Sequence, residues 1–115
     1  MAVTIYHNPR CSKSRAALKL IEERGIEPEV VRYLDAPPDA STLDALLTLL
    51  GLEPRELMRR KEPEYQALGL GDPSLSREAL IAAMVSHPRL IERPIVVRDG
   101  KAILGRPPER VLDLL

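Results

Sequence analysis

The single cysteine of the chain, Cys11, stands where a short apolar run ends and a helical pattern begins, in the stretch TIYHNPRCSKSRAALKLIEERG of residues 4–25. A cysteine in this place meets the unpaired backbone N–H groups and the positive dipole end of a helix, which favour a thiolate over a thiol. The same N–H groups bind oxyanions. The sequence therefore predicts a nucleophile that shares its place with an anion site.

The residues around Cys11 support a reactive role for it. Lys13 and Arg15 add positive charge within one helical turn, and His7 at the end of the preceding strand is placed to approach the sulfur across the loop. A lone cysteine is more often a small buried residue than a catalyst. However, a cysteine that follows Arg10 in a proline-containing loop is poorly placed to be part of a core.

Spacing excludes the other common uses of a cysteine. A CxxC redox pair would need a second cysteine at position 14, which is Ser14, and the loop of the low-molecular-weight phosphatases would need an arginine at Ala17. One cysteine and two distant histidines are too few for a tetrahedral zinc site. We therefore expect a reactive monothiol and no bound metal.

Composition and charge restrict the class of partner. The 17 basic side chains balance the 17 acidic ones, and the chain has three Tyr but no Phe or Trp, whereas single-stranded nucleic acid stacks on aromatic side chains. No apolar run reaches the roughly 20 residues of a membrane span, and no signal segment begins the chain. We therefore expect a cytoplasmic protein that binds neither nucleic acid nor a membrane and keeps its thiol reduced.

The N-terminal third reads as strand, helix and strand. Residues 2–7 are rich in β-forming side chains, residues 12–25 carry apolar residues at helical spacing up to a closing glycine, and residues 27–34 alternate like a second strand. Strands joined through a helix in this way pair in parallel, with a right-handed crossover.

The middle of the chain reads as helical, over residues 41–51, 54–61 and 76–88. Ser41 and Asp44 fit a capping box, and Gly51 fits the end of that helix. Pro54 suits the first turn of the second helix, and Ser76 can cap the third.

The C-terminal part predicts a hairpin and a last helix. Residues 93–105 read as two strands around an Asp-Gly turn, and residues 107–115 read as a helix. The whole order predicts an α/β fold of the thioredoxin/glutaredoxin type, with a four-stranded mixed sheet flanked by helices. We expect residues 1–115 to form one domain, with a helical insertion at about 41–88 between the βαβ and ββα halves.

Four segments together resemble the bacterial arsenate reductases that are coupled to glutaredoxin, and more closely the short members of that family. They occur in order along nearly the whole chain, as IYHNPRCSKSR, ELMRRKEPEY, ALIAAMVSHPRLIERPIVV and ILGRPPERVLDLL. The resemblance implies that a cysteine thiolate attacks arsenate, that glutathione displaces the adduct, and that glutaredoxin resolves the mixed disulfide as arsenite leaves. It implies glutathione as a co-substrate and no bound cofactor.

The resemblance also implies roles for individual residues. Cys11 is the nucleophile, and His7 helps to hold its pKa down. The residues that line the oxyanion site are Ser14, Arg15, Arg59, Arg93 and Arg106. The last three are arginines that bind arsenate and stabilise arsenite, and a guanidinium fork suits a tetrahedral oxyanion.

A cis bond between Arg93 and Pro94 is a further expectation from the resemblance. In thioredoxin-like folds a cis proline before the third strand turns the backbone toward the active-site cysteine, and a proline at the first residue of a strand loses no sheet hydrogen bond. The cis bond would aim Arg93 at the anion.

Two other function classes remain open from the sequence. The chain could exchange glutathione with protein thiols without meeting arsenate, or it could be a non-enzymatic regulator that binds a protein partner. Relatives of this fold that dock on RNA polymerase carry a CxxC switch, and Ser14 argues against such a switch here.

Overall fold

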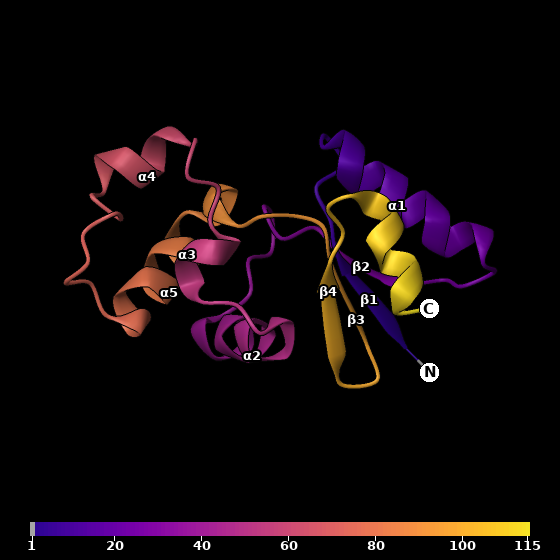
Figure 1. Ribbon diagram of the computed structural model, residues 1–115. Helices are drawn as coiled ribbons and strands as arrows, with labels where there is room; N and C mark the ends of the chain where they lie inside the picture. The colour runs from indigo at the N-terminus through magenta and orange to yellow at the C-terminus, as the bar shows by residue number, and fades with distance from the viewer. Residues whose placement is uncertain (1) are drawn as a thin grey trace. The chain divides into compact units, whose positions relative to one another are not determined.

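The computed structural model describes residues 2–115, which form two compact units (Figure 1). One unit combines residues 2–36 with residues 93–115, and the other consists of residues 37–92. Among the described residues, no helix has both the length and the apolar character needed to cross a membrane.

A four-stranded mixed sheet forms the centre of the first unit. Its strands are β1 (Val3–Tyr6), β2 (Glu29–Val31), β3 (Ile95–Arg98) and β4 (Lys101–Leu104), in the order β2-β1-β3-β4. The β1–β2 pair is parallel, and the β1–β3 and β3–β4 pairs are antiparallel. This is the thioredoxin-like arrangement that the sequence predicts.

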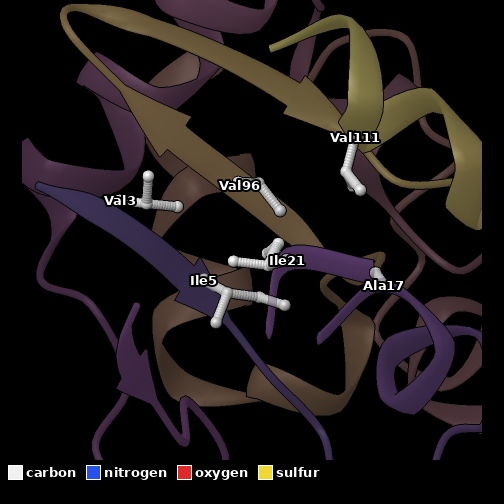
Figure 2. Packing of buried hydrophobic residues seen from close by; sticks show 6 residues of the cluster. All are labelled: Val3, Ile5, Ala17, Ile21, Val96 and Val111. Carbon is white, nitrogen blue, oxygen red and sulfur yellow. The ribbon is translucent and has the colours of Figure 1, made fainter. Parts of the chain in front are cut away.

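Helix α1 (Ser12–Glu23) packs on this sheet through the apolar stripe that its sequence predicts. It begins directly after Cys11, whose backbone is extended, and Gly25 follows its end with a positive φ of 74°. Figure 2 shows six apolar side chains of the core, which come from α1, the strands β1 and β3, and the C-terminal segment. The fully or almost fully buried members of this core are Val3, Ile5, Ala17, Ile21, Val96 and Val111.

The predicted C-terminal helix is present, and it is a 3-10 helix. Pro108–Asp113 forms the 3-10 helix η2, which packs against α1 and places Val111 in the core. Its hydrogen bonds span three residues, as in the bond from Leu114 N to Val111 O. Short helical pieces commonly adopt this tighter bond, and prolines at the N-cap and first positions remove no donor that the helix would use.

The Asp-Gly hairpin is confirmed. Arg98 pairs with Lys101 across a two-residue loop in which Asp99 has a φ of 51° and Gly100 a φ of 73°. Two positive φ values are what a type I′ turn requires, and this turn matches the twist of the strands beside it.

The second unit is helical and contains the predicted insertion. Its elements are α2 (Ala40–Leu50), α3 (Pro54–Leu57), α4 (Pro63–Ala67), α5 (Arg77–Ser86) and the 3-10 helix η1 (Pro88–Leu90). The C-terminal end of α2 at Gly51 and the Ser76 cap of α5 are as predicted. The prediction of one domain over residues 1–115 stays a prediction.

Two predictions for this helical unit are wrong. The cap of α2 is Asp39 and not Ser41, because Asp39 Oδ1 accepts the Thr42 N–H at 2.8 Å while Ser41 lies inside the helix. The predicted helix 54–61 ends at Leu57, because Met58 is extended and forms a β-bridge with Ile91. Helical spacing alone does not reveal such a long-range pairing.

Gly105 lies where a side chain would collide with the first unit's own structure. A Cβ atom there would stand 2.8 Å from Pro94 Cγ and 3.0 Å from Val111 Cγ1, and the Gly105 N–H donates to Pro94 O at 2.9 Å. The proline ring is a stiff neighbour that cannot rotate away.

We therefore expect Gly105→Ala to lower the free energy of unfolding by about 1–3 kcal/mol, the usual cost of overpacking. Urea unfolding measures it. Gly71→Ala is the matched control, because its Cβ would meet only Tyr65, at 3.7 Å, and its φ is not positive. Equal effects of the two substitutions would contradict the expectation.

Candidate active site

A tight loop carries Cys11 from the end of β1 to the start of α1. The Cys11 N–H donates to Asn8 O at 3.0 Å, and Asn8 Oδ1 accepts the Arg10 N–H at 3.0 Å. Arg15 Nη1 donates to Pro9 O at 2.9 Å from the first turn of the helix. These bonds fix the loop, and Cys11 itself is half-buried at the N-terminal end of α1.

A buried polar group lies under this loop. Ser14 is fully buried, and His7 and Asn8 are 6% and 5% exposed. Ser14 Oγ accepts the Asn8 N–H at 3.1 Å and lies 2.6 Å from His7 Nδ1. The His7 N–H donates to Val31 O at 2.8 Å, which ties the loop to β2.

His7 is the titratable residue of this group, and its lowered pKa favours the neutral ring. Burial lowers the pKa of His7 most, the positive charges of Arg32 and Arg15 lower it further, and Glu22 opposes them. A neutral imidazole with its proton on Nε2 accepts at Nδ1 the proton of Ser14 Oγ, which leaves the same oxygen free to accept from Asn8. The Ser14 hydroxyl then both donates and accepts.

Three donors favour the thiolate form of Cys11. Burial is the largest influence and raises the pKa of the thiol, but the Ser14 backbone N–H, the Arg93 side chain and the Lys13 backbone N–H together outweigh it, so the pKa of Cys11 lies below its ordinary value. The hydrogen bond of His7 goes to Ser14. The role expected for His7 in lowering the pKa of Cys11 therefore stays a prediction.

Arg93 reaches the cysteine from the segment that precedes β3. The Arg93–Pro94 bond is cis, which is the geometry that the resemblance implies, and the Arg106–Pro107 bond is cis as well. Arg106 Nη1 donates to Arg93 O at 3.2 Å. The Nε atom of Arg93 is buried and has no hydrogen-bond partner within residues 2–115.

The structure thus brings together six of the predicted site residues in the first unit. They are His7, Cys11, Ser14, Arg15, Arg93 and Arg106. Their contacts differ from the simple expectation of an anion lining, because Arg15 holds the loop at Pro9 and Arg106 holds the Arg93 carbonyl. Arg93 is the arginine that acts directly on Cys11.

Arg59 belongs to the second unit. Its Nε lies 3.6 Å from Glu62 Oε1 and 3.9 Å from Glu92 Oε1, and its N–H donates to Leu90 O at 2.7 Å. Its Nη1 atom is buried and lacks a hydrogen-bond partner in the described part of the chain. Arg60 is exposed and turns back to the carbonyl of Arg55 at 3.4 Å.

Sequence reasoning missed the two carboxylates beside Arg59. Glu62 follows Arg59 at a spacing of three residues, which is a usable signal for a local ion pair. The contact with Glu92 spans 33 positions, and no local pattern points to it. Across residues 2–115, no group of three or more His, Cys, Asp or Glu side chains is placed to hold a metal ion.

The chain matches known proteins over nearly its whole length. The family profile described as the ArsC family matches residues 6–114. The chain is 62% identical to the uncharacterized protein YfgD of Escherichia coli K12, with 98% of this chain and 96% of the relative covered. It is 56% identical to a protein named arsenate reductase from Neisseria meningitidis serogroup A, with 95% and 94% covered. A solved structure titled arsenate reductase from Vibrio cholerae matches with a TM-score of 0.97 and 56% identity, covering 100% of this chain and 98% of that one.

We expect the alkylation of Cys11 by iodoacetamide to show a midpoint below the free-thiol value of about 8.5. Arg93→Ala should raise this midpoint, because it removes a hydrogen bond and a positive charge from the sulfur. Arg24→Ala, on the exposed end of α1, should leave it unchanged. The same midpoint in all three proteins would show that Arg93 does not act on the thiolate.

The buried His7 should make the fold sensitive to mild acid. Its folded pKa is lowered, so its stabilising contribution is complete above the unfolded value of about 6.5 and is lost as the pH falls from there through the folded value. His7→Gln keeps a hydrogen-bonding group and does not titrate, so its free energy of unfolding should fall less between pH 7.5 and pH 5. Urea unfolding at both pH values, with the His7 ring followed by NMR, measures this. An equal fall in both proteins would contradict it.

Proposed function

Since the chain belongs to the ArsC family, we propose that it reduces arsenate to arsenite at Cys11. Glutathione is the thiol co-substrate, and glutaredoxin restores the free thiol. The proposal rests above all on the donors around the Cys11 sulfur, which are two backbone N–H groups and the Arg93 side chain. The buried Nε–H of Arg93 has no acceptor within residues 2–115 and can therefore donate to an oxyanion. Those are the groups that a thiolate and an oxyanion both need.

In the first step, the Cys11 thiolate attacks the arsenic of arsenate. A sulfur–arsenic bond forms, one arsenic–oxygen bond breaks, and the oxygen leaves as water after protonation. Arg93 supports this step because its guanidinium neutralises the charge of the oxyanion and keeps a fork of donors for its oxygens. Arg106 orients Arg93 through its bond to the Arg93 carbonyl.

In the second step, glutathione supplies the other thiol. Its sulfur attacks the adduct, a disulfide forms between Cys11 and glutathione, and arsenic leaves as arsenite with two more electrons than it had. Arsenate and two thiols thus give arsenite, one disulfide and water, so atoms and electrons balance. A thiol of glutaredoxin then attacks the glutathione sulfur, and Cys11 leaves as the thiolate.

His7 acts in this proposal as a positioning residue. Its neutral ring holds Ser14 Oγ, and the backbone N–H of the same Ser14 stabilises the Cys11 sulfur. Arg15 holds the loop at Pro9. Arg59 is a proposed arsenate ligand because its buried Nη1 has a donor to give and Glu62 and Glu92 orient its Nε.

The coupled oxidation of NADPH by arsenate, in the presence of glutathione, glutaredoxin and glutathione reductase, tests the proposal. Cys11→Ser should abolish it. Arg93→Ala should lower kcat roughly 100-fold or more, the usual cost of a lost oxyanion donor, and Arg93→Lys should recover little of it because lysine cannot fork. Arg24→Ala should retain full activity.

The two other function classes give different results in the same assay. A protein that only exchanges glutathione with protein thiols would consume NADPH with a glutathionylated substrate and not with arsenate. A regulator that only binds a partner would do neither. Either result would overturn arsenate reduction as the function.

A further inference from the structure

A cavity of about 250 Å³ opens beside the reactive loop of the first unit. One wall is the loop itself, with His7, Pro9 and Arg10, and the other wall is the segment after β2, with Arg32 and Asp35. Cys11 is the next residue after Arg10, but the oxyanion contacts described above use none of the side chains of the second wall. The cavity is therefore a separate feature next to the nucleophile.

Strand order places this cavity and Arg93 on opposite sides of the cysteine loop. Because β1 and β2 are parallel and β1 and β3 are antiparallel, the end of β1, the end of β2 and the start of β3 meet at one edge of the sheet. With β1 between the other two, the loop carrying Cys11 is flanked by Arg32 on the β2 side and by Arg93 on the β3 side. Two ligands can approach the sulfur without competing for the same groups.

Side chains of both charges line the cavity, and the ion pair between Arg32 and Asp35 is weak. Arg32 Nε lies 3.7 Å from Asp35 Oδ2, with both side chains mostly exposed at 63% and 73%. An exposed ion pair of this length contributes at most about 1 kcal/mol, so either partner is available to a ligand. Arg10 adds a second guanidinium, and Leu34 adds an exposed apolar surface.

We propose that this cavity binds the peptide part of the thiol co-substrate, a small peptide with two carboxylates and one ammonium group. The proposal rests on the proposed function and names the place where its second thiol binds. The two guanidiniums of Arg10 and Arg32 match the two carboxylates, and Asp35 matches the ammonium group. The cysteinyl arm of the peptide then extends over the loop to Cys11, while the β3 side stays open to the oxyanion.

The test uses thiol–disulfide exchange, which needs no arsenate. The Cys11 thiolate attacks one sulfur of glutathione disulfide, the disulfide bond breaks, and glutathione leaves as a thiolate while a mixed disulfide remains on Cys11. Mass spectrometry gives the second-order rate. Arg10→Ala and Arg32→Ala should each slow this reaction roughly twofold to fivefold, as expected for an exposed ion pair. Bis(2-hydroxyethyl) disulfide, which has no charges, should react with every variant at the wild-type rate.

Asp35→Asn separates a binding site from general charge attraction. Glutathione disulfide is an anion, so removing a negative charge should speed its reaction if only the net field of the protein matters. A contact between Asp35 and the ammonium group predicts a slower reaction instead. A faster reaction of Asp35→Asn, or arginine variants that react at the wild-type rate, would overturn the proposal.

A kinetic measurement then links the cavity to the proposed function. In the coupled assay, Arg32→Ala should raise KM for glutathione and leave KM for arsenate unchanged, whereas an increase in KM for arsenate instead would refute the separate site. If no arsenate were reduced at all, the proposed function would fail, while the exchange rates would still support or overturn the peptide site.

Discussion

The stabilisation of a negative charge on Cys11 is the constraint on which the rest of the first unit depends. Burial of the sulfur opposes that charge, and only donors held at fixed positions outweigh it. Ser14 serves both needs, because its backbone N–H faces the sulfur while its hydroxyl joins His7 and Asn8 beneath the loop. The start of α1 is thereby fixed to the end of β1, so the helix presents its free N–H groups where the thiolate forms.

Two arginines, one in each unit, carry a buried donor at a cost in stability. Arg93 Nε and Arg59 Nη1 are buried donors without partners in the part of the chain that the structure describes. A buried donor left unsatisfied costs about 1–3 kcal/mol. Neighbouring groups offset part of this cost, since Glu62 and Glu92 lie near the Nε of Arg59 and Arg106 holds the backbone of Arg93. In the proposed function, an oxyanion at Cys11 would satisfy the Arg93 donor when it binds.

Close backbone contacts hold the β3 side of the site in place. Gly105 donates to the carbonyl of Pro94, and its missing side chain leaves room for the Pro94 ring and for Val111. Val111 in turn belongs to the core that α1 shares with the sheet. The residue that follows Arg93 is therefore packed against the same core that supports the helix after Cys11, so Cys11 and Arg93 share one packed frame.

Local features of the sequence determined most of the elements and the place of Cys11 at the start of a helix. The place of Cys11 before a helical pattern, the Asp-Gly turn and the Ser76 cap each depend on neighbours a few residues away, and the structure has all three.

Tertiary structure decided what local patterns leave open. The β-bridge from Met58 to Ile91 ends a predicted helix early, Glu92 meets Arg59 from far along the chain, and Ser14 bonds His7 across the loop. The bond from Arg106 to the Arg93 carbonyl likewise joins residues 13 positions apart in the sequence. Periodicity and capping report the order of nearby residues, whereas these contacts depend on which distant segments the sheet brings together.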